Sequence, residues 1–288
     1  MKRTKNSEVK FRQYQTIFYN DPLNDDFASN NIVTKPLRAN FKYDNKNIFY
    51  RIGSWCLYFL VAIPILNTYN FFKRHKVENR KVIRKLKKQG FVVYMNHVTD
   101  LDPLYLMGFI LGYHHRRAYV IAGLDAFSIK GVSWIVKGLG GLPVPENYQN
   151  AKDLKHKIKD VLEDKNQVLC VYPEEHIWPY FTGIRPFKAT SFRYPVDHNV
   201  PAVPIVTVFA SRKKWNKKPK PRFIICEPIY PDMSIENRSE RSQKLRDDVY
   251  NQMVKVSSSY PNDEYIRYIK RTTPKAKQTD ALIKDSQQ

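Results

Sequence analysis

From about residue 90 onward, short apolar runs alternate with segments of helical length, and this alternation restricts the possible folds more than any other feature. The apolar runs occupy residues 90–97, 117–123, 168–175, 202–210 and 222–230. Helical composition or amphipathic spacing is found at residues 103–112, 150–167 and 237–260. Strands separated by helices predict an α/β fold with a layered, largely parallel sheet flanked by helices. In such sheets, functional side chains gather at the carboxyl ends of the strands.

A second feature is an apolar segment without charged residues between Ile52 and Phe72. It is long enough to reach across a bilayer, but Pro64 and several Asn and Thr residues weaken its second half. The basic block 73–88 follows it, and the preceding tail is also net basic, so the Lys/Arg asymmetry of a spanning helix is missing. We therefore expect a monotopic or re-entrant membrane-associated segment. A true span and a buried core helix remain the alternatives.

The charge of the chain is strongly unbalanced. It carries 49 Lys and Arg against 27 Asp and Glu, a formal net charge of +22. This excess predicts an anionic partner, either nucleic acid or a membrane with anionic lipids. The blocks 73–88 and 212–222 are the densest basic stretches, and we expect them to contact anionic headgroups. The three cysteines lie far apart without metal-ligand spacing, so no metal site is expected.

Two polar residues five positions apart follow the first apolar run. His97 comes at the exit of the predicted strand, and Asp102 precedes Pro103 at the start of the next helix. If the chain turns there, the carboxylate of Asp102 can accept a hydrogen bond from one imidazole nitrogen and leave the other free to take a proton. Two simpler interpretations remain open, since Asp102 suits a helix N-cap and His97 suits a packed histidine.

A second group of polar residues follows the run that ends near residue 172. Glu174 comes directly after this strand and a proline, and aromatic residues, Arg185 and Lys188 come after it. A carboxylate, an aromatic surface and two cations near one strand end could order a polar acceptor and bind phosphate. The alternative is a loop whose charges are solvated.

Taken together, these stretches resemble the glycerolphosphate and 1-acylglycerol-3-phosphate acyltransferase family. Its NHxxxxD motif is matched at 96–102, its aromatic-Pro-Glu motif at 172–174, its Phe-Lys at 187–188 and its Val-Pro-Ile-Val-like strand at 203–206. The family's second motif usually ends in an Arg that contacts the acceptor phosphate, and residues 140–147 contain none. The third motif usually continues as Gly-Thr-Arg after the glutamate, and here Glu175 and His176 follow instead.

The resemblance implies which residues form the site. His97 is expected to be the general base, with Asp102 orienting it. The residues expected to bind substrate are Asn96, Glu174, Arg185 and Lys188. Because the second-motif Arg is missing, either Arg185 and Lys188 bind the acceptor phosphate or the acceptor is not a simple glycerol phosphate. No G-x-S-x-G elbow is present, in line with a mechanism that needs no covalent nucleophile.

The function implied by the resemblance is transfer of a fatty acyl group from acyl-CoA or acyl carrier protein to a hydroxyl of a lysophospholipid. The donor is a co-substrate, and no cofactor is expected. One alternative keeps this chemistry with a glycolipid or another lysolipid as acceptor. A second is a basic nucleic-acid or membrane-binding protein without catalysis. Nucleic acid is not expected, because no RNP-like or KH-like motif is present.

These inferences divide the chain into four parts. We expect a polar basic arm at 1–45, a membrane-associating helix and basic block at 46–88, the acyltransferase domain at 89–265 and a disordered tail at 271–288. The first 45 residues contain no apolar core of the kind a signal peptide needs. The protein is therefore predicted to lie on the cytoplasmic face of the cell membrane, as a monotopic or singly anchored protein.

Overall fold

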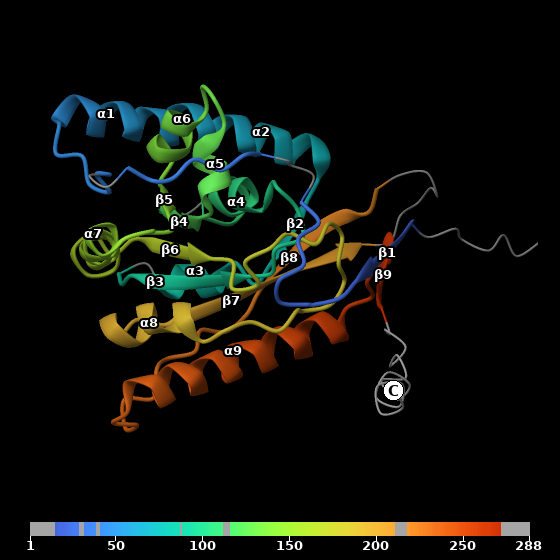
Figure 1. The fold of residues 1–288 in the computed structure, drawn as a ribbon. Coiled ribbons are helices and arrows are strands. Elements are labelled where there is room, and N and C mark those ends of the chain that lie inside the picture. The colour runs from blue at the N-terminus through green and yellow to red at the C-terminus, as the bar shows by residue number, and fades with distance from the viewer. Residues whose placement is uncertain are drawn as a thin grey trace, which may run out of the picture.

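The computed structural model describes residues 15–28, 32–38, 41–86, 88–111, 116–210 and 218–271. One large sheet lies between two layers of helices (Figure 1). The strands are β1 Gln15–Tyr19, β2 Lys76–Glu78, β3 Phe91–Met95, β4 Ala118–Ala122, β5 Gly141–Pro143, β6 Val168–Val171, β7 Ala202–Ala210, β8 Lys220–Ile225 and β9 Ile266–Lys270. The α-helices are α1 Ile48–Cys56, α2 Ile63–Lys73, α3 Lys81–Lys85, α4 Asp102–Tyr105, α5 Leu124–Ser128, α6 Ser133–Gly138, α7 Tyr148–Lys159, α8 Arg193–His198 and α9 Arg238–Ser259.

Four short helical segments extend or precede these helices, namely η1 Leu57–Ala62, η2 Leu106–Leu111, η4 Asp160–Asp164 and η5 Thr190–Phe192. The segment η1 joins α1 to α2, so that residues 48–73 form one continuous helical rod. In the same way, η2 continues α4 and η4 continues α7.

The large sheet has seven strands in the order β2-β8-β7-β3-β6-β4-β5. The pairs β3–β6, β3–β7, β4–β6, β4–β5 and β2–β8 are parallel, and β7–β8 is antiparallel. The predicted α/β class with a largely parallel sheet is therefore confirmed. The strand β8 is the next described strand after β7 in the sequence and pairs with it directly. The strand β2 comes from the basic block that the sequence assigns to the membrane-associating part.

Each face of the sheet is covered by its own apolar core, as expected for a parallel sheet buried on both sides. On one face, α7, α8 and α9 contribute side chains such as Ile158, Val196 and Val249. On the other, the rod, α3 and η2 contribute side chains such as Tyr58, Ile83 and Leu106. Figure 1 shows α1 and α2 above the sheet and α9 below it.

The rod formed by α1, η1 and α2 is mostly uncovered. Asn47 caps its first turn by accepting hydrogen bonds from the amides of Phe49 and Tyr50. The helix Ile48–Lys73 is long and apolar enough to cross a membrane by length and composition, and only 17% of its apolar window is buried within the protein. Phe49 and Phe71 are among its exposed side chains. This exposure argues against the buried-core alternative, because a core helix is covered on most sides.

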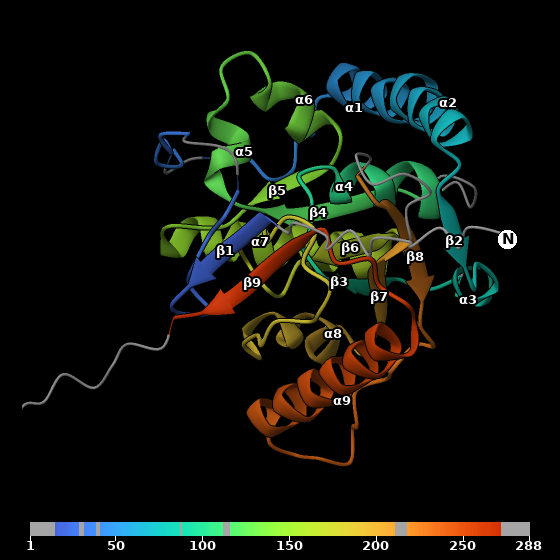
Figure 2. The ribbon, with the colours of Figure 1, turned by 90° about the vertical axis from the view of Figure 1, so that its right-hand side faces the viewer.

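The amino-terminal arm is packed against the molecule at several points along its length. The strands β1 and β9 form a separate two-stranded parallel sheet, with Gln15 opposite Ile266 (Figure 2). Further along, the carbonyl of Asp25 accepts a hydrogen bond from Trp178 Nε1 at 2.7 Å. The predicted disordered tail lies outside the described residues except for Arg271, and most of the basic block 212–222 lies outside them as well.

Candidate active site

The predicted site residues meet at the carboxyl edge of the central strands. The strands β3 and β6 are parallel neighbours, with Tyr94 opposite Val171. His97 follows β3 by two residues and Glu174 follows β6 by three, so strand pairing brings the two motifs together. The amide N–H of His97 donates to Glu174 Oε2 at 3.2 Å. The carboxyl-edge location predicted for functional residues therefore matches the position of both motifs.

His97 and Asp102 form a direct pair. The distance between His97 Nδ1 and Asp102 Oδ2 is 3.0 Å. An ionised carboxylate only accepts hydrogen bonds, so this contact places the proton on Nδ1 and leaves Nε2 unprotonated. The side chain of Asp102 is fully buried, whereas that of His97 is 13% exposed. The imidazole therefore reaches the surface while the group that orients it does not.

The surroundings of Asp102 keep its carboxylate in one place. Burial raises its pKa, and the hydrogen bond and charge of His97 act in the opposite direction, as do hydrogen bonds from the amides of Thr99 and Val98. These two amides donate to the same Oδ2 at 3.0 and 2.9 Å. Three donors on one oxygen stabilise the charged form that holds the histidine.

The alternative role for Asp102 was that of a helix N-cap alone. The residue begins α4, and its carboxylate accepts from Val98 and Thr99, which precede the helix. An N-cap side chain would instead accept from amides inside the first helical turn. The geometry therefore fits the orientation of His97 better than it fits capping, and Pro103 still supplies the favourable start of the helix.

A tyrosine fixes the plane of the imidazole. The rings of His97 and Tyr172 are stacked, with centroids 4.2 Å apart and an interplanar angle of 23°. Tyr172 is buried and immediately follows β6. The aromatic residue of the 172–174 motif thus packs against the catalytic candidate from the neighbouring strand. Sequence matching places this residue in a motif but does not reveal the ring contact.

Glu174 and Arg185 form a buried ion pair behind His97. Arg185 Nη2 lies 3.4 Å from Glu174 Oε2, and the amide of Arg185 donates to Glu174 Oε1 at 2.9 Å. The guanidinium also donates to the carbonyls of Glu174, His176 and Pro22, and it stacks over Trp178 at 4.9 Å. Burial raises the pKa of Glu174, and the charge of Arg185 opposes that rise.

Asn96 holds the end of β3 to the neighbouring strand β7. Its Nδ2 donates to the carbonyl of Thr207 at 3.1 Å, and its Oδ1 accepts from the amide of Thr207 at 2.8 Å. The Asn96 side chain therefore replaces a pair of ladder hydrogen bonds. No signal in the sequence points to Thr207, since only its backbone takes part.

The six predicted site residues thus fall into two groups. His97 and Lys188 reach the surface, and the Lys188 side chain is 57% exposed with Nζ 4.0 Å from Glu175 Oε2. Within the protein lie Asn96, Asp102, Glu174 and Arg185. Glu174 and Arg185 form hydrogen bonds with neighbouring protein groups, so a substrate cannot reach them in this conformation. The binding roles assigned to Asn96, Glu174 and Arg185 stay predictions.

The residue after Glu174 explains one departure from the family pattern. Glu175 adopts a φ of 64°, in the left-handed region that favours glycine. The family motif usually has glycine at this position. The backbone turn typical of glycine is therefore kept here with a glutamate, at some conformational cost. Among the described residues, no group of three or more His, Cys, Asp and Glu could hold a metal ion.

Comparison with protein families supports the class suggested by this arrangement. Residues 74–208 match the family model described as Acyltransferase. The matched stretch runs from before β2 into β7 and contains both His97–Asp102 and Glu174–Arg185. The resemblance noted in the sequence is thereby confirmed, and this stretch of the chain is similar to the acyltransferase family.

One solved structure similar to this chain is the crystal structure of the 1-acyl-sn-glycerophosphate (LPA) acyltransferase, PlsC, from Thermotoga maritima. The sequence identity is 17% and the TM-score is 0.48, and the similarity covers 74% of this chain and 99% of that chain. Comparison with curated proteins gives no match. The family match, together with the geometry of His97, therefore carries the functional argument.

Proposed function

We propose that the protein transfers a fatty acyl group from acyl-CoA or acyl carrier protein to a hydroxyl of a lysophospholipid such as 1-acylglycerol-3-phosphate. The observation that carries this proposal is the 3.0 Å contact between His97 Nδ1 and the buried Asp102, inside the segment that matches the acyltransferase family. The contact defines a histidine with a free Nε2 at the carboxyl edge of the sheet, where ligands of such folds bind.

The mechanism needs one base and an activated donor. His97 Nε2 takes the proton of the acceptor hydroxyl as its oxygen attacks the thioester carbonyl, forming a tetrahedral intermediate. The C–S bond then breaks, the ester is left on the acceptor, and the thiolate receives the proton from the imidazolium. The carboxylate of Asp102 stabilises the imidazolium between these steps. Every proton is thus returned, and no group on the protein is acylated.

The buried neighbours of His97 have a positioning role in this proposal. Glu174 accepts the His97 amide, and Arg185 holds Glu174, so the pair fixes the backbone that carries the base. Of the two cations considered for the acceptor phosphate, Arg185 is 2% exposed, whereas the side chain of Lys188 is 57% exposed beside Glu175. We therefore assign the contact with an anionic acceptor to Lys188.

The acceptor is tested with the purified full chain, a labelled palmitoyl thioester and a panel of acceptors. We expect labelled product with 1-acylglycerol-3-phosphate, and the thioester is offered on coenzyme A and on acyl carrier protein to identify the donor. If only a glycolipid or another lysolipid is labelled, that molecule is the acceptor. The missing second-motif Arg favours this alternative. Absence of label on every acceptor would contradict acyl transfer and leave a binding protein.

We also propose that the rod formed by α1, η1 and α2 attaches the enzyme to the cytoplasmic face of a membrane with anionic lipids. The support is its uncovered apolar surface, followed directly by basic residues. The acyl donor has an apolar chain and the acceptor is amphiphilic, so both partition into the bilayer. An enzyme held at the membrane surface meets both substrates there.

Replacing Leu60 and Phe72 with aspartate should weaken binding to lipid vesicles by at least about tenfold, because burying each such side chain contributes roughly 1.5–3 kcal/mol. These side chains are 60% and 74% exposed, so the fold should tolerate the change. Vesicle co-sedimentation measures the effect. Aspartate at Tyr148 and Met233, exposed elsewhere at 85% and 49%, is the matched control. Equal losses in the two double variants would contradict attachment through the rod.

A further inference from the structure

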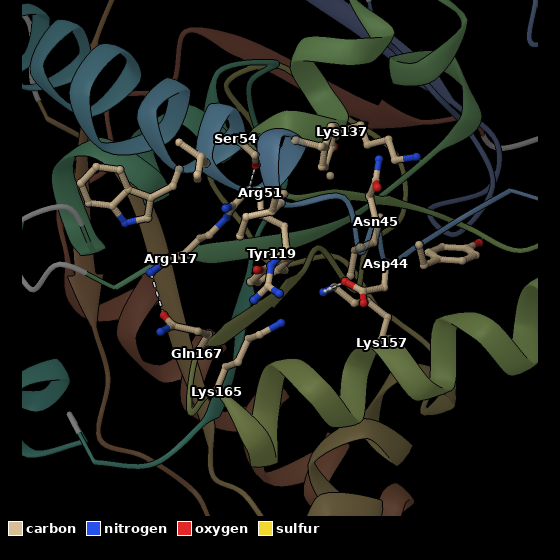
Figure 3. Close-up of a pocket in the computed structure, with 18 of the residues that line it drawn as sticks. Asp44, Asn45, Arg51, Ser54, Arg117, Tyr119, Lys137, Lys157, Lys165 and Gln167 are labelled. Carbon is tan, nitrogen blue, oxygen red and sulfur yellow. Dashed lines mark hydrogen bonds and ion pairs between the residues drawn. The ribbon is translucent and has the colours of Figure 1, made fainter.

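A second possible binding site lies far from His97. A cavity of about 670 Å³ is bordered by α1, the segment before it, the starts of β4 and β5, and the end of α7. Its volume is in the range of sites that take small molecules. The labelled basic side chains approach it from several sides around Tyr119 (Figure 3).

The position of the cavity follows from the strand register. Phe91 and Ala118 both lie opposite Val168, and all three begin parallel strands. Arg117 lines the cavity directly before β4, whereas His97 follows the far end of β3. His97 is six positions after Phe91, which corresponds to about 20 Å of extended chain. The cavity is therefore at the amino edge of the sheet, and His97 does not border it.

Most of the charged side chains in the lining are basic. They are Arg51, Arg117, Lys137, Lys157 and Lys165, and the acidic side chain that lines the cavity with them is Asp44. Two of the cations are already paired. Lys157 Nζ lies 3.2 Å from Asp44 and 2.8 Å from Asp160, and Lys165 Nζ lies 2.6 Å from Asp160.

The other three cations have no carboxylate partner within the part of the chain that the structure describes. Arg117 Nη2 donates to two neutral acceptors, Ser54 Oγ at 2.7 Å and the carbonyl of Gly138, and its Nε is buried without a partner among the described residues. In the same described part of the chain, Arg51 forms no ion pair. Lys137 Nζ lies over the ring of Phe41, and burial, together with the charge of Lys42, lowers the pKa of Lys137.

Like charges held together in a hollow raise the local potential and attract an anion. Guanidinium groups match the oxygens of a phosphate in particular, since they donate two parallel hydrogen bonds. One side of the cavity is apolar. Ile48 and Trp55 of the rod line it there and are 57% and 51% exposed. An amphiphile could thus place its charged end in the cavity and its apolar part along the rod.

We propose that this cavity binds the phosphate group of an anionic ligand, separately from the acyl-transfer site. The chemistry is shared by the headgroup of an anionic phospholipid and by a soluble phosphate compound, and the apolar rim favours the headgroup. The proposal does not rest on the role of His97. A phosphate bound between Arg51, Arg117 and Lys137 would supply the counter-charge that these side chains lack.

The test uses the full chain and a double variant, Arg51→Gln with Lys137→Gln, which removes two of the three cations proposed to bind the phosphate. The soluble probe is inorganic pyrophosphate, titrated by calorimetry into the detergent-solubilised protein. The membrane probe is co-sedimentation with phosphatidylcholine vesicles that contain phosphatidic acid, compared with pure phosphatidylcholine vesicles. We expect the double variant to bind at least one of the two probes about tenfold more weakly, since each cation near bound phosphate contributes a several-fold gain in affinity.

The matched control is Lys152→Gln with Lys155→Gln, which removes the same charge from exposed positions on α7 that do not line the cavity. Loss confined to the cavity variant supports the site, and the probe that shows it identifies the source of the phosphate. Equal loss in both double variants, or no loss in either, overturns the proposal. Unchanged melting temperatures exclude misfolding, and a His97→Ala variant should bind both probes normally, which separates this result from any failure of acyl transfer.

Discussion

Replacing His97 with alanine should lower kcat/KM for acyl transfer by about a thousandfold, within the usual range of 10²–10⁴ for loss of a general base. The reason is geometric, because the imidazole is the titratable group that Asp102 orients at 3.0 Å and that reaches the surface. The thioester still activates the carbonyl, so slow transfer by water-assisted proton loss remains. The measurement is initial-rate kinetics with a labelled acyl thioester and the acceptor found in the screen.

Two further variants make this result specific. In Asp102→Asn the amide cannot accept all three donors that meet at Oδ2, and activity should fall by at least about a hundredfold as the tautomer is lost. His198→Ala removes a histidine from another His–carboxylate pair, with Glu163 at 2.6 Å, and should keep its activity per folded molecule. An alanine variant of His97 with more than about a tenth of wild-type turnover would exclude it as the base.

Replacing Arg185 with leucine should lower the free energy of unfolding by about 3–5 kcal/mol, because it leaves the buried carboxylate of Glu174 without its partner. The side chains of Arg185 and Glu174 are 1% and 0% exposed, so water cannot replace the lost contacts. The variant also removes donors from the carbonyls of His176 and Pro22. Denaturant unfolding followed by circular dichroism measures the loss.

The double variant Arg185→Leu with Glu174→Gln should recover part of this stability, since the buried charge is then removed together with its partner. The matched control is Arg267→Gln at the exposed pair with Glu264, where we expect less than about 1 kcal/mol. A loss at Arg185 as small as that at Arg267 would show that the buried pair does not stabilise the fold. It would also weaken the positioning role given to Glu174.

The order of the central strands was not predictable from their apolar runs, although their existence was. Each run of β3, β6 and β7 is buried on both faces and therefore consists almost entirely of apolar residues, which makes it visible in the sequence. The short strand β2 has three residues, too few to show a period. The strands β1 and β9 lie near opposite ends of the chain, and no local sequence pattern predicts that they pair.

The candidate site was predictable to the extent that its chemistry is local. His97 and Asp102 are five residues apart on one turn, and their contact follows from that turn. The roles expected for Asn96 and Arg185 depended on which groups meet them from other strands, and the structure gives them protein partners instead. The basic cavity was missed for the same reason, since its cations come from separate elements that only the fold assembles.

The contacts between the amino-terminal arm and the loop after β6 join two distant parts of the chain. Pro22 and Asp25 lend main-chain oxygens to Arg185 and Trp178, and both acceptors precede residue 74, where the family match begins. Residues 74–208, which match the family model, are thus packed against a part of the chain that lies outside the match. These contacts depend on the backbone conformation of the arm and not on its side chains at Pro22 and Asp25, because every residue has a main-chain oxygen.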